Sequence, residues 1–537
     1  MAGSVLNSSS VFQLNFSAKL KLCASITGTS PSCKTLAARL LNQRIMKCHR
    51  IKILFVLALI CPCSLVLSQS FESRIMDIKS MQEELPFIQN KLNEVHPEPY
   101  HFISKADFEQ GLARLKSNIK PMTKEQWYVE LAGLIAALHD GHTGLYYPDE
   151  DRQKYFDLGG KTFPFWVNLD DDGRVVIRQQ YLQDDRLTDA AILEINGKPI
   201  HEVIEKMYPL TFGEAEVFRN SQISSSFRRM YWLLYGHTDS VALKTRLASG
   251  SIYEKNAACI SLAQHDSITK ILFPVTTMPK RTHMHFTHLN DRKVGLLTLR
   301  DFGTYKGYKD SISHVFRQIQ EHAIDTLFLD LRGNGGGEHY ITEEINQYLL
   351  RVPWVLVSKA KIKMSKEFYG IFPKSVRWLA RVLPKKPAIK LAASIMTRNT
   401  KIEKVEKVLD SLTKAPTYEI HTRPKLHYAE KYFYSGNVFL LTDRNSYSMS
   451  GMFAAIMKDY QRAVIVGEET GGLANPHGQN VELTLPHSKF VFYVSTSRAY
   501  RPSGVFDNRG VIPDVPISYK ILSRANSIED LISLIAK

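Results

Sequence analysis

Two segments of the 537-residue chain place residues suited to acyl-transfer chemistry directly after short apolar strands. Residues 326–337 read TLFLDLRGNGGG and end in three glycines, and residues 437–459 read NVFLLTDRNSYSMSGMFAAIMKD and present three serines before a helix. Glycines let backbone N–H groups approach a reacting carbonyl, and a serine at a helix N-terminus sits in a positive field. The two segments together predict an oxyanion hole facing a nucleophile, as in a serine hydrolase.

Ser448 is the leading candidate for the nucleophile, and Ser446 and Ser450 are its rivals in the same segment. A serine at this place most often caps the following helix, so a purely structural role is the alternative. The glycines Gly335–Gly337 would supply N–H groups to the oxyanion. Phosphate binding is less favoured, because Glu338 and His339 follow the glycines where a Walker loop has Lys and Ser or Thr.

A serine nucleophile needs a base, and His142 in the segment LHDGHTGLYY is the candidate. A neutral imidazole titrates near working pH, so it can take the serine proton and return it to the leaving group. A carboxylate should orient the imidazole, and Asp507 is the predicted partner. Spacing along the chain leaves three alternatives for this carboxylate, Asp140, Glu468 and Asp514.

The first 70 residues have the pattern of a leader. Residues 46–70 join a basic start, an apolar stretch and a polar exit, which predicts a secretory signal and an exported protein, periplasmic or extracellular. Residues 1–45 are then a mis-called or disordered extension, with a transit peptide as the rival. An uncleaved signal, or a lipid on Cys61 or Cys63, would instead attach the protein to a membrane.

Charge and cysteine content exclude several classes of function. Residues 1–68 carry eight Lys or Arg and no acid, so half of the net charge of +16 lies there and nucleic acid is not an expected partner. Beyond residue 64 the sequence has one cysteine, Cys259, which argues against an internal disulfide, a cysteine metal site or a thiol nucleophile. We expect no metal and no cofactor.

Hydrophobic patterning predicts three regions that must position these residues. Residues 71–150 read as helices ending in the His142 loop, and residues 155–285 read as a β-rich module with an Asn196-Gly197 turn. Residues 286–537 alternate strands and helices, which favours a parallel sheet.

A basic insertion at 350–430 interrupts the third region. Its stretch 359–407 has 14 Lys or Arg against three acids, which is typical of a solvated helical insertion. The alternatives are a lid over the site or a contact with an anionic membrane surface.

Several strings together resemble the tail-specific, or C-terminal processing, serine peptidase family. They are DLRGNGGG, SMSGMFAAIMKDY, RAVIVGEETGG, GVIPDVPI and, nearer the N-terminus, DGHTGLY. The resemblance implies an α/β fold with a crotonase/ClpP-like catalytic core. It also implies that residues 155–285 form a PDZ-like module, which adds a peptide as an extra strand and captures its terminal carboxylate.

The resemblance assigns the nucleophile to Ser448 and adds the Met449 N–H group to the oxyanion hole. Two positions depart from the best-known branch of the family. Its glutamate after the nucleophile motif is Gly451 here, and its lysine base falls on Leu473, so a Ser–Lys dyad is not expected. The branch that resembles the tricorn core protease uses serine, histidine and an acid, which implies Ser448, His142 and Asp507.

The sequence therefore predicts an exported serine endopeptidase that acts on peptides or proteins and recognises C-terminal tails. Two alternatives remain: a non-catalytic carrier of lipid- or retinoid-type ligands on the same fold, and an esterase or amidase of small molecules. The sequence does not indicate the oligomeric state.

Overall fold

The computed structural model describes residues 74–535, except for 182–183, 273–281, 290, 373, 375–376, 379–400 and 409–414. All described residues belong to one compact unit, Phe71–Lys537. The predicted signal at 46–70 and the extension at 1–45 lie outside the described residues.

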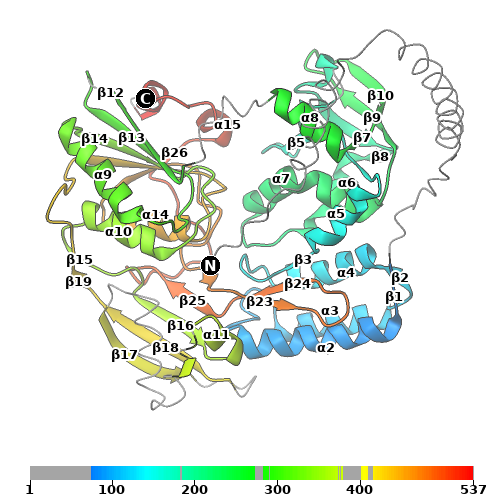
Figure 1. Ribbon diagram of the computed structural model, residues 1–537, viewed down its shortest axis with the longest axis horizontal. Coiled ribbons are helices and arrows are strands. Elements are labelled where there is room, and N and C mark those ends of the chain that lie inside the picture. Colours follow the sequence, from blue (N-terminus) through cyan, green and yellow to red (C-terminus); the bar gives the residue numbers. More distant parts are fainter. Residues whose placement is uncertain are drawn as a thin grey trace, which may run out of the picture. The chain divides into compact units, whose positions relative to one another are not determined.

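A six-stranded, mostly parallel sheet forms the centre of the third region (Figure 1). Its strands in spatial order are β12 (Met284–Leu289), β13 (Val294–Leu299), β14 (Thr326–Asp330), β20 (Asn437–Thr442), β21 (Val464–Gly467) and β26 (Val515–Pro516). β12 runs antiparallel to β13, and every other neighbouring pair is parallel. The parallel pairing predicted from the sequence is confirmed. Because β14 and β20 are neighbours, the loops that leave their C-terminal ends meet at one edge of the sheet.

Helices cover both faces of this sheet, as their apolar stripes require. One core contains the buried faces of α9 (Tyr308–Glu321), α10 (His339–Leu349) and α14 (Met449–Asp459). Ile312 and Phe316 of α9 are among its members, as the helical spacing predicts. α16 (Ile528–Ile535) packs in a second cluster with Phe328 and Leu441 of the sheet, and α15 (Tyr519–Leu522) precedes it.

The N-terminal region is helical, as predicted. It consists of β1 (Ile75–Met76), α2 (Ile78–Val95), α3 (Lys105–Ser117), β2 (Met122–Thr123), α4 (Lys124–Ala136), β3 (Gly144–Tyr146) and α5 (Asp149–Asp157). The Ser104 side chain caps α3, and Thr123 forms a capping box with Gln126 at the start of α4. β3 pairs with β24 (Val491–Val494), which pairs with β23 (Val481–Thr484). The loop that carries His142 is therefore fixed to a segment more than 300 residues away.

The β-rich module has its own sheet and core. Its path is β10 (Ile252–Ala258), β9 (Ser240–Arg246), β7 (Ala191–Ile195), β6 (Val175–Gln180) and β5 (Phe165–Leu169), with β8 (Lys198–Pro199) beside β7. The remaining elements are β4 (Lys161–Thr162), β11 (Ile260–Ser261), α6 (Ile200–Met207), α7 (Glu216–Tyr235), α8 (Leu262–Leu272) and the 3₁₀ turns Asp185–Leu187 and Tyr208–Leu210. Asn196 and Gly197 both have positive φ, which fits the predicted tight turn. Cys259 is buried in this core.

The expectation of a helical insertion is wrong for much of 350–430. Residues here form β15 (Pro353–Trp354), β16 (Lys359–Lys363), α11 (Lys366–Gly370), β17 (Lys401–Val408), β18 (Thr417–Arg423) and β19 (Lys425–Leu426). β16 lies between β18 and β25 (Ser497–Tyr500), and β22 (His477–Gly478) completes the five-stranded sheet. Ile362 and Ile420 are buried beneath it. The lysines alternate with apolar residues along these strands, so pairing to β25 overrides the apparent helical pattern. Among the described residues, no helix is long and apolar enough to cross a membrane.

Candidate active site

Ser448 occupies a strained backbone position at the start of α14. Its φ and ψ are 55° and −119°, a region that residues other than glycine rarely adopt. The residue stands at the N-cap, yet its side chain makes no capping hydrogen bond. The hydroxyl instead lies 2.8 Å from the Nε2 atom of His142. The structural alternative for this serine, a helix cap, is therefore not what its side chain does.

The two rival serines are occupied or enclosed. Ser446 is fully buried, and its hydroxyl donates to the Leu331 carbonyl oxygen at 2.9 Å and accepts the Asp443 N–H at 3.0 Å. Ser450 is also fully buried in the core side of α14. Ser448 is the one of the three that lines a cleft.

His142 reaches Ser448 from a loop between α4 and β3. Burial lowers the pKa of His142, and the charge of Asp140 opposes that shift. A neutral ring with an unprotonated Nε2 can accept the serine proton directly. The other ring nitrogen, Nδ1, is buried and has no hydrogen-bond partner among the described residues. No carboxylate in the described chain therefore contacts the ring nitrogen in the way that Asp507 was expected to.

The Asp140 carboxylate accepts four hydrogen bonds. Its Oδ1 accepts the backbone N–H of His142 at 2.8 Å. Its Oδ2 accepts from three side chains, which are His96 Nε2 at 2.6 Å, Thr143 Oγ1 at 2.8 Å and Ser495 Oγ at 3.0 Å. Burial alone would raise the pKa of Asp140, but nearby histidines and these hydrogen bonds hold that pKa well below its ordinary value. Asp140 is thus a buried anion that fixes the main chain of His142.

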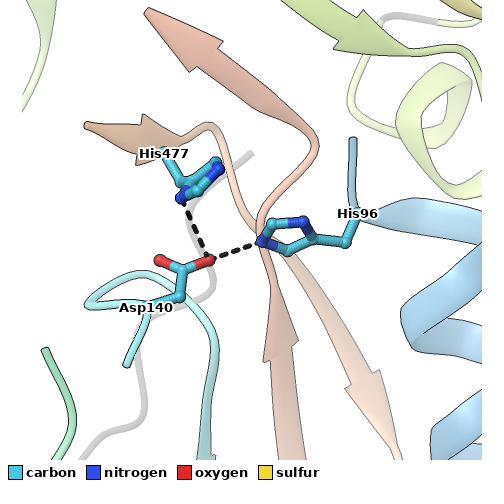
Figure 2. A group of neighbouring side chains, drawn as sticks. All are labelled: His96, Asp140 and His477. Atoms are coloured by element: carbon cyan, nitrogen blue, oxygen red, sulfur yellow. Dashed lines mark hydrogen bonds and ion pairs between the residues drawn. The ribbon is translucent and has the colours of Figure 1, made fainter. Parts of the chain in front are cut away.

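Figure 2 shows the rings of His96 and His477 next to each other, both facing the same oxygen of the Asp140 carboxylate. Potential ligand atoms of these three buried residues lie within 4.8 Å of one another, which raises the question of a metal ion. The Nδ1 atom of His96 accepts the Glu98 N–H at 3.0 Å, so the proton of a neutral ring sits on Nε2 and points at Asp140. A metal would need that nitrogen unprotonated, and Oδ2 already receives three donors. The arrangement fits a carboxylate that accepts several hydrogen bonds rather than a metal site.

His477 lies near two carboxylates. Each of its ring nitrogens lies 3.8 Å from a carboxylate oxygen, one of Asp140 and one of Glu98. Burial nevertheless lowers the pKa of His477 to about 4, so the ring is neutral at pH 7.

The carboxylate predicted to orient His142 lies elsewhere. Among the described residues, the Asp507 side chain is hydrogen-bonded to Asn475 Nδ2 at 3.4 Å, and it makes no bond to His142. Glu468 pairs with Arg444, and Asp514 accepts from Lys458 at 2.8 Å. Of the four carboxylates that spacing left open, the structure brings Asp140 to the histidine, through the main chain.

The glycine loop lies against the start of α14. The Tyr447 N–H donates to the Asn334 carbonyl oxygen at 3.0 Å. A Cβ atom added to Gly336, which has φ of 101°, would lie 2.8 Å from the Met449 nitrogen and from the Ser448 Cβ. Only glycine permits this approach. The glycine loop therefore lies directly beside Ser448.

The individual N–H groups of the loop have different neighbours. The Gly336 N–H donates to Asn334 Oδ1 at 2.9 Å, so it is already engaged. Gly337 forms a bridge with Phe302, whose backbone a Cβ atom there would strike at 2.5 Å. The N–H groups of Gly335 and Met449 have no acceptor in the described part of the chain, which leaves them free for an oxyanion. Gly335 also lines the cleft.

The two departures from the family pattern have structural counterparts. A Cβ atom at Gly451 would lie 3.1 Å from the Gly472 carbonyl oxygen, so a glutamate there would need the neighbouring strand connection to move. Leu473 is 2% exposed and belongs to the interior. A lysine base at that position is absent, as the sequence indicates.

Glu214 is a residue that sequence reasoning missed. Its Oε1 accepts the Gly141 N–H at 3.2 Å, so it helps to hold the His142 loop. Burial raises the pKa of Glu214 to about 8, and the charge of Asp140 acts in the same direction. Nothing in the GEAE segment marks this glutamate, because its burial comes from contacts with Gly141 and Tyr447, which are remote in sequence.

A cleft of about 1680 Å³ opens over the Ser448–His142 pair. Its walls come from the glycine loop, the Tyr447 segment, β3, and elements of the β-rich module that include β5 and α7. A cleft of this size accommodates several residues of an extended peptide.

Comparison with known proteins gives a family match for part of the chain. Residues 293–517 match peptidase family S41. The fold is similar to that of mature CPAF complexed with lactacystin, at 15% sequence identity and a TM-score of 0.57 over 86% of this chain and 99% of that one. A second structure of mature CPAF gives 15% identity and a TM-score of 0.56 over 82% and 92% of the two chains. At such identity the likeness concerns the fold.

The family match confirms the resemblance drawn from the motifs. It includes the glycine loop and Ser448, whereas His142 precedes the matched range. It favours a serine-type peptidase over the carrier and esterase alternatives. The mixed α/β fold with a helical N-terminal region is likewise confirmed.

Proposed function

We propose that this chain cleaves internal peptide bonds, with Ser448 as nucleophile and His142 as base. The proposal builds on the match of residues 293–517 to peptidase family S41, a family of serine-type peptidases. The observation that carries the proposal is the 2.8 Å separation of Ser448 Oγ and His142 Nε2. It lies within the range that proton transfer requires.

The reaction follows from this geometry. His142 Nε2 takes the hydroxyl proton while Ser448 Oγ attacks the peptide carbonyl carbon. The oxyanion forms beside the N–H groups of Gly335 and Met449, at the positive end of α14. The imidazolium then returns its proton to the leaving amine as the C–N bond breaks. Water enters, gives a proton to His142 and hydrolyses the acyl-enzyme, which restores Ser448.

Asp140 acts in this proposal as a positioning residue. Its anionic carboxylate holds the His142 main chain and three neighbouring side chains, so the imidazole stays in line with Ser448. Its negative charge also opposes the effect of burial on the pKa of His142, which favours the imidazolium formed in the transition state. Asp507 keeps the status of a rival for this role.

We also propose that the β-rich module is a PDZ-like domain that recognises peptide tails. β5 is an edge strand of its sheet, and residues of β5 and of α7 line the same cleft as Ser448. An extended peptide can pair with such an edge while its side chains occupy the groove beside the helix. A tail held there would feed the scissile bond toward Ser448.

Export is the third part of the proposal, and it rests on residues 46–70 alone. N-terminal sequencing of the mature protein tests it, because cleavage near residue 70 is expected. A contact between the basic stretch 359–407 and an anionic membrane stays a prediction.

The catalytic proposal is tested with a fluorophosphonate probe on the full chain, followed by mapping of the adduct. We expect labelling at Ser448 that is abolished in Ser448→Ala and falls by about two orders of magnitude or more in His142→Ala. Ser450→Ala is the matched control, because that buried hydroxyl lacks a partner in the described chain. Labelling that survives Ser448→Ala would rule out the proposed nucleophile.

A further inference from the structure

Five aromatic side chains form a connected row along the cleft. Their ring centroids are separated by 4.1 Å for Tyr447–Phe218, 6.4 Å for Phe218–Phe212, 5.8 Å for Phe212–Tyr146 and 5.0 Å for Tyr146–Tyr493. All five line the same cleft as Ser448. Apart from Tyr447, each is half-buried, so part of its ring surface remains open to an incoming group.

The row begins at the reactive pair. Tyr447 directly precedes Ser448, and its ring stacks against His142 with centroids 5.3 Å apart and planes 24° apart. On its other side it stacks on Phe218 at 6°. The apolar surface therefore starts within one residue of the nucleophile.

Elements far apart in sequence build this row. Tyr146 belongs to β3 and Tyr493 to β24, which pair with each other, whereas Phe218 lies in the first turn of α7 and Phe212 in the loop before it. Contacts among rings hold each ring partly in place before any ligand arrives. Such a rigid aromatic surface loses little conformational entropy on binding.

Charged side chains line a different part of the cleft. They come from the β-rich module and from the segment that contains α15 and the residues after it, and they include Asp170, Arg174, Arg178, Lys520 and Arg524. Several pair with one another, as Arg174 does with Asp170 and Arg178 with Asp189. The aromatic part of the cleft wall thus differs in chemistry from the part that carries these charged side chains.

We propose, on the basis of the proposed peptidase function, that this row is a subsite for a large apolar side chain of the substrate immediately beside the scissile bond. Its ligand class is the aromatic and branched aliphatic residues, such as Phe, Tyr and Leu. Contact with several half-buried rings removes apolar surface of both partners from water, whereas a charged side chain would lose hydration with no compensating partner. The row therefore determines specificity for the hydrolysis.

The test uses two sets of internally quenched peptides. Within one set the peptides differ only in the residue immediately before the cleavage site, and within the other only in the residue immediately after it. We expect the full chain to cleave a Phe or Leu peptide with kcat/KM at least about 30-fold above that of its Ser or Asp counterpart. Phe212→Ala and Tyr493→Ala should each lower the ratio of kcat/KM for the apolar peptide to kcat/KM for its polar counterpart by about 10-fold. Two independent variants guard against one that misfolds.

Phe433→Ala is the matched control. Phe433 is half-buried and contacts Tyr428, but it does not line the cleft, so the ratio should stay unchanged. Equal kcat/KM for the matched peptides, with Ser448 labelled normally by the fluorophosphonate, would overturn the subsite and leave the peptidase intact. Failure of both labelling and cleavage would refute the proposed function, and the subsite with it.

Discussion

Replacement of Asp140 by Asn tests how the His142 loop is held. The variant keeps the size of the side chain but removes its charge and turns one acceptor oxygen into a donor. Four donors converge on this carboxylate, at 2.6–3.0 Å. Hydrogen bonds to charged groups contribute about 1.5–3 kcal/mol and neutral ones about 0.5–1.5 kcal/mol. An average loss of about 1 kcal/mol per donor predicts a free energy of unfolding lower by about 4 kcal/mol.

The same change should slow the reaction through the position of His142. A displacement of a reacting group by about 1 Å costs about 100-fold in rate. We therefore expect kcat of Asp140→Asn to fall by about 100-fold, with KM nearly unchanged because Asp140 does not line the cleft. Urea unfolding gives the stability, and steady-state kinetics on a cleaved peptide gives kcat and KM, scaled to the fraction of enzyme labelled by the fluorophosphonate.

Asp507→Asn is the control that separates the two candidate acids. Its carboxylate bonds only to Asn475 among the described residues, at 3.4 Å, so we expect kcat within about threefold of the wild type. The reasoning is refuted if Asp140→Asn retains full kcat while Asp507→Asn loses about 100-fold. That outcome would mean that the Asp507 carboxylate approaches the His142 imidazole during turnover.

Three further predictions concern the surroundings of the site. The Glu214 carboxyl holds its proton more tightly in the folded protein than in the unfolded chain, because folding raises its pKa from 4.5 to about 8. The stability that this proton contributes is complete below about pH 4.5 and is lost as pH rises through about 8, so Glu214→Gln should gain in Tm relative to the wild type between pH 5 and pH 9. A Tm difference that is the same at both pH values contradicts this. Gly336→Ala should lower kcat/KM by about 100-fold or more, because its Cβ atom would lie 2.8 Å from the Met449 nitrogen, whereas Gly478→Ala, where space is open, should not. Leu473→Lys, which restores the lysine of the related branch, should lower the free energy of unfolding by about 3 kcal/mol or more without a gain in kcat, since the side chain is 2% exposed. A stable and faster variant in urea unfolding and peptide kinetics would show that the lysine fits.

Local patterns predicted the strands and helices that carry the site. The apolar run VGLLTL at residues 294–299 is typical of a buried strand and forms β13, and the apolar face of α9 is buried as its spacing requires. Thr123 and Gln126 form the capping box that their separation indicates. These features depend on neighbours three or four residues away, so one segment of sequence contains the relevant physics.

The insertion shows where local patterns are insufficient. β16 and β17 have many lysines, which as isolated segments favour a solvated helix, yet both lie in a sheet with β18. Ile362 of β16 is buried in a cluster with Ile420 of β18, and β16 also pairs with β25, more than 130 residues later. Strand propensity depends on such partners more than helix propensity does.

By itself the sequence indicated the segment of the proposed nucleophile, the glycine loop and the histidine, since each has a residue type and a local setting that acyl-transfer chemistry requires. Only the tertiary structure decided which carboxylate lies beside the histidine. Asp140 became the buried anion because His96 and Ser495, which are remote in sequence, converge on it together with Thr143 of its own loop, and Glu214 became a high-pKa carboxyl because it is enclosed beside that anion. Charge and burial at a point in space depend on every chain segment around it, and no single stretch of sequence contains that information.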